Sequence, residues 1–393
     1  MTIEHHPNRS RAQTLPRPGS GTGTSNGTGT PEAVGTSGPS LRSSHAIGAE
    51  SSPSRESSGA GEWAGRRVLI TGGLGFIGST LAHRLVGLGA DVLIVDSLIP
   101  QYGGNWFNLH GIQDRVRVNL ADLRDRHVLP HLVRDRDVIF NLVGQTSHLD
   151  SMTDPLTDLA INTEAQLHLL EACRKEAPET RIVFASTRQI YGAPGYLPVD
   201  EAHPIVPPDV NGVNKLAGEF YHLLYHRVHG LKASSLRLTN TYGPRMRVKD
   251  ARQTFLGIWI RLALQGKPFE VWGGEQLRDF TYVDDAVNAF LAAVTPATEG
   301  KAFNIGGFPP MSLAALAETL IAANGGGTSV IKPFPDDRKK IDIGDYHADD
   351  SAFRAATGWR PRVDMPEGLR RTLAWYRSNL AQYWQEDAAP GRP

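Results

Sequence analysis

The stretch Val68-Leu69-Ile70-Thr71-Gly72-Gly73-Leu74-Gly75-Phe76-Ile77-Gly78 decides the fold of this chain. A short apolar run ends in glycines spaced three apart, and an amphipathic helix pattern follows. The first glycine of such a unit permits a sharp turn, the second lets backbone N–H groups approach a pyrophosphate, and the third lets the helix pack closely on the strand. The stretch therefore predicts a dinucleotide site that includes Gly72, Gly75, Phe76, Ile77 and Gly78.

From Arg66 onward the pattern alternates strand and helix. After the strand at 68–70 and its helix, further strands are predicted at 92–95, 116–118, 138–143, 182–185 and 233–238. Long helices are predicted after Pro155 and after Asp209. The alternation implies right-handed βαβ crossovers, so the predicted fold class is α/β, a Rossmann doubly wound parallel sheet with a smaller C-terminal substrate-binding lobe.

The predicted domains follow from composition and pattern. Residues 1–62 hold no Phe, Trp, Tyr or Cys and contain Ser- and Gly-rich runs, which is typical of a disordered leader, either a solvated tail or a docking segment. No apolar segment suited to a secretory signal lies there. The other predicted parts are a dinucleotide-binding domain at 63–242 joined by 278–306, a lobe at 243–277 and 307–385, and a tail at 386–393.

Bulk composition restricts the partners. The 393 residues carry 41 basic and 41 acidic groups, a balance that argues against nucleic acid or a membrane surface as the main partner. The one cysteine, Cys173, allows no internal disulfide and indicates a reducing compartment, the cytoplasm. No apolar run is long enough to span a membrane.

Two acidic residues follow the second and third predicted strands. Asp96 stands 18 residues after Gly78, where a carboxylate accepts hydrogen bonds from the adenosine ribose and repels a 2′-phosphate. NAD is therefore favoured over NADP. Asp122, with Leu123 after it, follows the strand that would lie near the adenine, although this segment has the pattern of a helix start as well.

Several motifs together resemble the extended short-chain dehydrogenases, the family of NAD-dependent nucleotide-sugar epimerases and dehydratases, and UDP-glucose 4-epimerase-like members in particular. The similar segments are Thr71–Gly78, Asn141–Gln145, Ser186–Gly192, Leu238–Arg245 and Arg278–Asp285. The resemblance covers roughly residues 66 to 380. It implies a transient oxidation in which NAD takes a hydride from a sugar carbon, usually C4, and returns it.

The resemblance also implies residue roles. Thr187 stands where a hydroxyl hydrogen-bonds the reacting oxygen, or it is a strand-end Thr that satisfies backbone groups. Lys215 matches the lysine that binds the nicotinamide ribose. The family motif is Tyr, three residues, Lys, yet Asn211 occupies the Tyr position. An amide cannot serve as a general base near neutral pH.

Three interpretations of Asn211 remain open. Another group replaces the tyrosine, namely His148, Asp209, Tyr191 or Lys215 itself; or the redox chemistry is slow or altered; or the protein binds its ligands without turnover. The first is favoured because the other motif residues are present.

Arg188 and Gln189 follow Thr187 where related dehydratases carry an acidic pair, so dehydration is disfavoured against epimerisation. Arg188 pairs with a substrate carboxylate or makes a structural salt bridge. The other predicted substrate residues are Gln145 and His148 near the sugar, and Asn240, Arg245, Arg278 and Arg338 at the diphosphate.

The leading hypothesis is thus an NAD-dependent nucleotide-sugar epimerase without a metal site. The alternatives are a dehydratase, a decarboxylase, a net dehydrogenase or a catalytically impaired NAD-binding homologue. Helices at 156–176 and 210–229 each carry an apolar stripe, which predicts a homodimer unless both stripes face their own sheet.

Overall fold

A seven-stranded parallel sheet forms the centre of the structure, a computed structural model that describes residues 60–99, 101–250, 252 and 254–385. The strand order is β11-β6-β5-β4-β1-β2-β3. The strands are β1 (Arg67–Thr71), β2 (Asp91–Asp96), β3 (Val116–Leu120), β4 (Val138–Asn141), β5 (Arg181–Thr187), β6 (Lys232–Leu238) and β11 (Ala302–Ile305). The Rossmann α/β fold predicted from the sequence is confirmed.

The strand order fixes where a ligand can bind. From β1 the chain builds β2 and β3 on one side, and β4, β5, β6 and β11 extend the sheet on the other side. The order therefore reverses between β1 and β4, and in open parallel sheets ligands bind at the carboxyl ends of the strands at this reversal. Asp96 and Thr187 end β2 and β5 on that edge.

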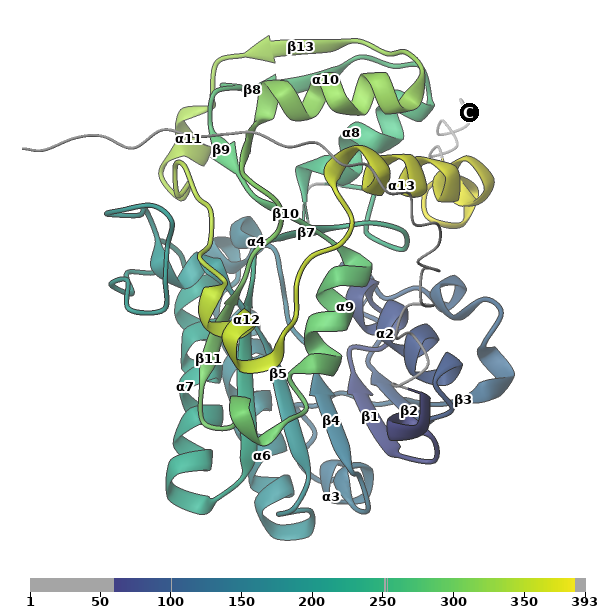
Figure 1. Cartoon of the computed structure of the whole chain (residues 1–393), viewed down its shortest axis with the longest axis vertical. Helices are drawn as coiled ribbons and strands as arrows, with labels where there is room; N and C mark the ends of the chain where they lie inside the picture. Colours follow the sequence, from purple (N-terminus) through teal and green to yellow (C-terminus); the bar gives the residue numbers. More distant parts are fainter. Residues whose placement is uncertain (1–59, 100, 251, 253, 386–393) are drawn as a thin grey trace, which may run out of the picture. The chain divides into compact units, whose positions relative to one another are not determined.

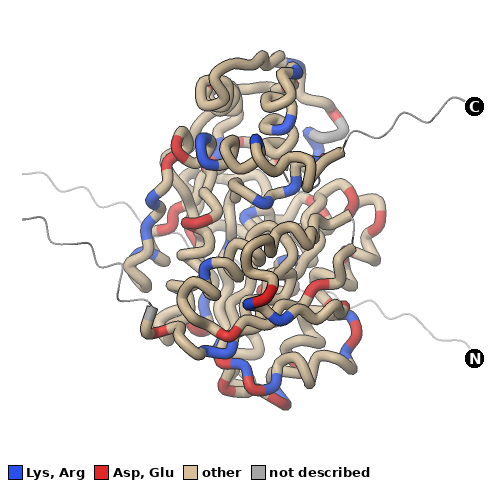
Figure 2. Tube along the Cα trace, turned by 90° about the vertical axis from the view of Figure 1, so that its right-hand side faces the viewer, with Lys and Arg blue, Asp and Glu red and all other residues tan. Residues whose placement is uncertain are grey.

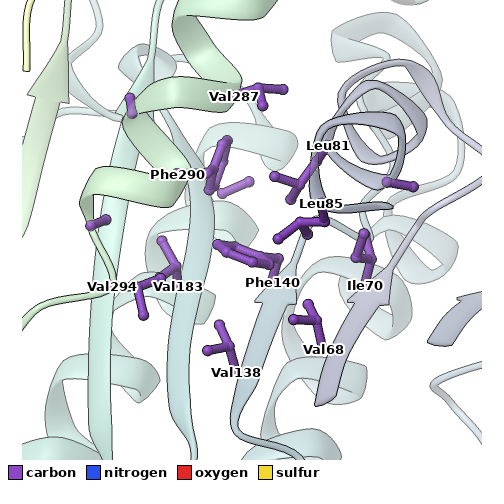
Figure 3. Close-up of a cluster of buried hydrophobic side chains, with 14 of the residues drawn as sticks. Val68, Ile70, Leu81, Leu85, Val138, Phe140, Val183, Val287, Phe290 and Val294 are labelled. Atoms are coloured by element: carbon purple, nitrogen blue, oxygen red, sulfur yellow. The ribbon is translucent and has the colours of Figure 1, made fainter. Parts of the chain in front are cut away.

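Helices cover both faces of the sheet. On one face, α2 (Phe76–Gly87) and α9 (Val283–Ala292) lie side by side. Figure 3 shows Phe290 of α9 beside Phe140 of the sheet, with ring centroids 6.3 Å apart. The opposite face carries α3 (Leu129–Val133), α6 (Ala165–Glu176) and α7 (Val210–His229). Strand β4 is buried on both faces, which explains why its residues are largely apolar.

The helix predicted after Pro155 is not continuous. It consists of α5 (Pro155–Leu159), a π-helical turn at Ala160–Glu164 and α6, and a short α4 (His148–Thr153) precedes it. The π turn rotates the two halves relative to each other, so the predicted stripe does not stay on one face. Leu170 is buried whereas Leu156 is 74% exposed.

Helix α7 follows Asp209 as predicted, but its apolar stripe faces away from the sheet. Val213, Phe220, Leu224 and Val228 are exposed. The inner face instead carries buried polar residues. One of them is Glu219, which forms a buried ion pair of 2.6 Å with Arg237 of β6. Buried polar contacts therefore determine which side of α7 faces the sheet, and the apolar periodicity of its sequence does not.

The residues beyond Gly243 build a second apolar core, which Figure 1 shows at the end of the sheet where α8, α10 and α13 gather. Its helices are α8 (Phe255–Leu264), α10 (Leu313–Asn324) and α13 (Met365–Asn379). The same part of the chain contains the short helix α11 (Asp336–Lys339), and α12 (Ser351–Thr357), whose Phe353 packs on Phe303 of β11. The strands of this part form two-stranded sheets, in which β7 pairs with β10, β8 with β13 and β9 with β12. Their bounds are β7 (Asn240–Tyr242), β8 (Phe269–Trp272), β9 (Leu277–Arg278), β10 (Phe280–Tyr282), β12 (Met311–Ser312) and β13 (Ser329–Lys332).

The structure describes only part of the two predicted terminal segments, the leader and the tail. Of the predicted leader, residues 1–59 lie outside the described residues, and Ala60–Trp63 form the short helix α1 with Trp63 buried against Phe140. Residues 60–62, which the prediction assigned to the leader, thus belong to this described helix. The predicted tail, 386–393, lies outside the described residues as well. The other domain boundaries stay predictions.

Charge and hydropathy add two observations on the described part of the chain. In the view of Figure 2, basic and acidic residues are both scattered over the trace. None of the described helices is both long and apolar enough to cross a membrane.

Candidate active site

The turn between β1 and α2 has a backbone that only glycine adopts easily. Gly72 has a φ of +70°, in the left-handed region that disfavours other residues. A Cβ atom on Gly78 would lie 2.3 Å from the carbonyl oxygen of Gly72, so α2 packs directly on the turn. Gly75 caps α2 without a side-chain hydrogen bond, which leaves the first N–H groups of the helix free to bind an anion. This turn fits a diphosphate.

Asp96 lies beside that turn and is almost buried. One carboxylate oxygen accepts a hydrogen bond from the N–H of Leu74 at 3.0 Å and the other from the N–H of Leu98 at 2.8 Å. Burial raises the pKa of Asp96, and the two N–H groups partly offset that effect. The hydrogen bonds fix the carboxylate at the edge of the cavity, where ribose hydroxyls can donate to it.

Asp122 lies further along the same cavity, with Leu123 next to it. Its carboxylate accepts a hydrogen bond of 2.6 Å from the guanidinium of Arg124, which lowers the pKa of Asp122. Asp122 is therefore a fixed negative charge at the end of the cavity formed after β3.

A first cavity runs from the glycine turn along the carboxyl ends of the strands to α7. It brings together these residues that the sequence predicted: Gly72, Gly75, Phe76, Ile77, Gly78, Asp96, Asp122, Leu123, Gln145, His148, Thr187, Arg188, Asn211, Lys215 and Asn240. A second cavity lies between the sheet end and the C-terminal core, and Arg278 lines it. Four residues line both cavities, so the two adjoin there: His148, Arg188, Asn240 and Thr254.

Thr187 and Lys215 face the first cavity from β5 and α7. The Thr187 hydroxyl oxygen accepts a hydrogen bond from the N–H of Gln189 at 3.2 Å, so the hydroxyl caps the next turn while its own proton stays available to donate. The Lys215 ammonium donates to the carbonyl oxygen of Ala185 at 3.2 Å and lies 4.9 Å from the centre of the Phe184 ring. Burial lowers the pKa of Lys215 to about 8.

Asn211 is held in a buried polar network. Its amide nitrogen Nδ2 lies 2.7 Å from the carbonyl oxygen of Gln145 and 3.0 Å from Oδ2 of Asp158. The other oxygen of Asp158 accepts from Nδ2 of Asn214 at 2.8 Å. Because both partners of Asn211 are acceptors, the amide orientation is determined. No described donor reaches its carbonyl oxygen Oδ1, and the residue lines the first cavity.

His148 and Asp209 form a close pair at the start of α4 and α7. Nδ1 of His148 lies 2.9 Å from Oδ2 of Asp209, whose carboxylate is fully buried. The two atoms are close, but their geometry is not that of a hydrogen bond. Asp209 also accepts from the N–H of Gly212 at 2.7 Å and from Nε2 of Gln189 at 2.9 Å. Burial raises the pKa of Asp209, but His148 and these two donors outweigh it and the pKa is lowered.

The second cavity is lined by three polar side chains, those of Arg188, Asn240 and Arg278. Arg188 donates to Oδ1 of Asn240 at 2.8 Å, and its guanidinium lies over the ring of Tyr346. Burial and the nearby charge of Arg278 lower the pKa of Arg188 to about 10. Arg278 is paired with Asp342 at 2.8 Å. Arg188 forms no ion pair with any residue of the described ranges, so the structural salt bridge considered from the sequence is absent there.

One predicted substrate residue, Arg245, lines neither cavity. Its guanidinium lies over the ring of Trp375, 4.8 Å from its centre. The backbone of Arg245 has a positive φ of 72°. The role of Arg245 at the diphosphate stays a prediction. The side chain of Arg338 lies outside the described part of the structure.

The sequence missed Asp158 and the role of Gln189. Asp158 stands between Thr157 and Leu159 in α5, and no local pattern marks it as buried, since its partners are more than fifty residues away. Gln189 was noted only for replacing an acid. The fact that could have pointed to its present role is its place two residues after Thr187, which ends a strand that borders the site.

Comparisons with known proteins agree with this geometry. Residues 68–306 match the NAD dependent epimerase/dehydratase family. The chain is 33% identical over 317 residues to a putative UDP-glucose 4-epimerase of Methanocaldococcus jannaschii, covering 79% of this chain and 99% of the relative. It is 31% identical over 341 residues to a dTDP-glucose 4,6-dehydratase of Streptomyces niveus, covering 83% and 98%.

A solved structure shows the same arrangement. The UDP-glucose 4-epimerase of Thermotoga maritima, crystallised with UDP-glucose, superposes with a TM-score of 0.73 and 29% identity over 80% of this chain and 99% of that one. The Rossmann sheet, the glycine turn and the family match lead to one conclusion: the chain belongs to the NAD-dependent epimerase/dehydratase family, within the extended short-chain dehydrogenases, and its cofactor is NAD.

Proposed function

We propose that this protein is a nucleotide-sugar epimerase that works through a transient 4-keto sugar. The observation that supports it most is the meeting of two cavities at His148, Arg188 and Asn240. One cavity fits a dinucleotide, and the other presents arginines to an anionic ligand. A sugar bound between them would have its ring beside the nicotinamide end of the first cavity.

Different residues of this chain bind the cofactor and the reacting sugar. The N–H groups at the start of α2 bind the cofactor diphosphate, and Asp96 accepts from the adenosine ribose. Lys215 holds the nicotinamide ribose, and the Thr187 hydroxyl donates to the reacting sugar oxygen. Bound NAD supplies a reversible acceptor for the hydride on the sugar carbon.

The second cavity suits a nucleoside diphosphate. Arg278 and Asn240 stand at its entrance for the diphosphate oxygens, and aromatic side chains further inside, including Trp259 and Phe334, offer flat surfaces for a base. The relatives named for UDP- and dTDP-sugars support this class of substrate.

Epimerisation is favoured over dehydration by the residues after Thr187. Water elimination needs an acid and a base at that place, whereas Arg188 is cationic and Gln189 donates its amide to Asp209. A second candidate function, an NAD-binding homologue with impaired catalysis, is favoured by Asn211 alone, because its amide cannot take up a proton.

We further propose a homodimer in a reducing cytoplasm. Helix α7 carries exposed Val213, Phe220 and Val228, and it contacts α5, where Leu156 is also exposed. A second copy of the chain would bury these residues by two-fold pairing. The buried free thiol of Cys173 is consistent with a reducing compartment.

The test is incubation of the purified full-length protein with UDP-, dTDP-, GDP- and CDP-sugars, followed by chromatographic separation of products and measurement of NADH absorbance. The proposal expects conversion of one sugar to its C4 epimer without accumulation of NADH. Stoichiometric NADH would instead identify a net dehydrogenase, and a dehydrated or decarboxylated product would identify those reactions. No conversion by folded protein that retains NAD would support the impaired homologue.

A further inference from the structure

We propose that His148 is the general base that replaces the missing tyrosine and that buried Asp209 positions it. This inference rests on the proposed function, because a base is needed only if a sugar hydroxyl is oxidised. It assigns a catalytic role to one residue, His148, and a positioning role to another, Asp209, and it accounts for both from contacts that the structure shows.

The first argument is the position of His148. It is one of the few residues that border both cavities, at the place where the sugar would lie between diphosphate and nicotinamide. Its Nδ1 is buried against Asp209, while 39% of the side chain remains exposed. The exposed part of the ring is therefore the part away from Nδ1, which includes Nε2.

The second argument is how firmly Asp209 is held. Its carboxylate accepts from the N–H of Gly212 and from Gln189, and it lies at the N-terminus of α7, where a negative charge is stabilised. A buried carboxylate on Nδ1 keeps the proton on that nitrogen and leaves Nε2 free to accept one. The same carboxylate stabilises the imidazolium once it forms.

The third argument is that the amide NH₂ group of Asn211 already donates to acceptors in the protein. Its NH₂ group is used by Gln145 and Asp158, and only its carbonyl oxygen is left to face the cavity. That oxygen can accept a hydrogen bond from a ligand hydroxyl, but it cannot remove the proton. Asn211 can therefore bind the sugar hydroxyl as the usual tyrosine would, but another group must accept the proton of that hydroxyl.

Two other groups considered as bases fit less well. Tyr191 is completely buried, bonds to Arg237 at 2.6 Å and to Asn304 at 2.7 Å, and borders neither cavity. Lys215 borders the first cavity but not the second, and its ammonium is bonded to the carbonyl oxygen of Ala185. Lys215 is the competing base that the experiment must exclude.

The proposed step balances as follows. The O–H bond at sugar C4 breaks and its proton moves to Nε2 of His148, while the C4–H bond breaks and its hydrogen leaves with two electrons for the nicotinamide. The carbon is oxidised to a ketone and the cofactor is reduced. After the sugar turns over, hydride and proton return to C4 and its oxygen, and both His148 and the cofactor end as they began.

The test compares H148Q, D209N and K215M with wild type. Glutamine keeps a donor for Asp209 but has no basic nitrogen, so kcat of H148Q is expected to fall about 10²- to 10⁴-fold. Asparagine at 209 can still accept from Gly212 but removes the charge, and kcat is expected to fall at least about tenfold with little change in KM. Exposed His127 and Asp114 provide matched controls, H127Q and D114N, which are expected to keep wild-type turnover.

Chemical rescue separates catalysis from packing. In H148A, added imidazole is expected to restore part of the turnover, and the restored rate is expected to rise with pH as free imidazole loses its proton. A merely structural role for His148 would give no such rescue. Equal thermal stability and NAD content of the variants confirm that the site is intact.

A measurement without turnover tests the pair directly. In protein labelled with ¹⁵N-histidine, the Nδ1 proton of His148, assigned by its absence from H148Q, is expected to be protected from exchange in wild type and exposed in D209N. An unprotected proton in wild type would contradict the pairing.

The outcomes distinguish this inference from the function on which it rests. If wild type epimerises a sugar and H148Q is as active, the base assignment is wrong and the function stands. Loss of activity in K215M that retains its full NAD content then makes Lys215 the base. If wild type converts no sugar of the panel, both are overturned, and a protected Nδ1 proton would mark a structural pair only.

Discussion

Replacing Asp158 with alanine is expected to destabilise the protein strongly, although this residue touches neither cavity. Its fully buried carboxylate accepts hydrogen bonds from Asn211 and Asn214 at 3.0 and 2.8 Å. Alanine would leave one N–H of each amide buried without an acceptor. A buried donor that loses its partner costs about 1–3 kcal/mol, so the two together cost about 2–6 kcal/mol. That is a large part of the 5–15 kcal/mol by which domains are usually stable.

Urea unfolding followed by tryptophan fluorescence measures this free energy. D114A, which removes an exposed carboxylate, is the matched control and is expected to change the free energy of unfolding by less than about 0.5 kcal/mol. In a double-mutant cycle, D158A and N214A together are expected to cost less than the sum of the two, because the double variant has one orphaned amide fewer. A loss below about 1 kcal/mol in D158A, or strict additivity in the cycle, would refute the network.

Three further predictions follow from the site and the surface. D96A is expected to weaken NAD binding about 10- to 100-fold in calorimetry, because a charge-assisted pair of ribose hydrogen bonds is lost; an unchanged Kd would remove Asp96 from the site. Burial lowers the pKa of Lys215 to about 8, below the value of about 10.4 in an unfolded chain, so the unfolded state binds more protons between these values. Wild type should therefore gain stability relative to K215M as pH rises from about 8 to about 10.4, and parallel curves would contradict this. F220E is expected to convert a dimer to a monomer in light scattering, whereas I331E, a change at an exposed apolar residue of β13, should not; a dimeric F220E would place the interface elsewhere.

The fold was predictable because its constraints are local. The turn at Gly72 and Gly78 leaves no room for other side chains, and strands buried on both faces must be apolar, so both appear in short stretches of sequence. Asp96 was recognisable for the same reason, since it ends a strand at a fixed distance from the glycines. Its hydrogen bonds to Leu74 and Leu98 are formed within that local unit.

The parts that the sequence did not reveal depend on contacts between distant segments. Asp158 meets Asn211 and Asn214 across more than fifty residues, and the pairing of His148 with Asp209 spans two helix starts. The outward turn of the α7 stripe was also not decided by periodicity, because its inner face is polar. The motif that contains Arg245 gave its position in the chain but not its contact with the ring of Trp375.

The most direct measurement is the fate of the hydrogen at sugar C4. The nucleotide sugar that the protein converts is prepared with deuterium at C4, and the product is analysed by NMR and mass spectrometry. Internal return of the hydride predicts an epimer that keeps the deuterium at C4, with no label in free NADH. A product that has lost its deuterium to solvent, or label that accumulates in NADH, would contradict the account.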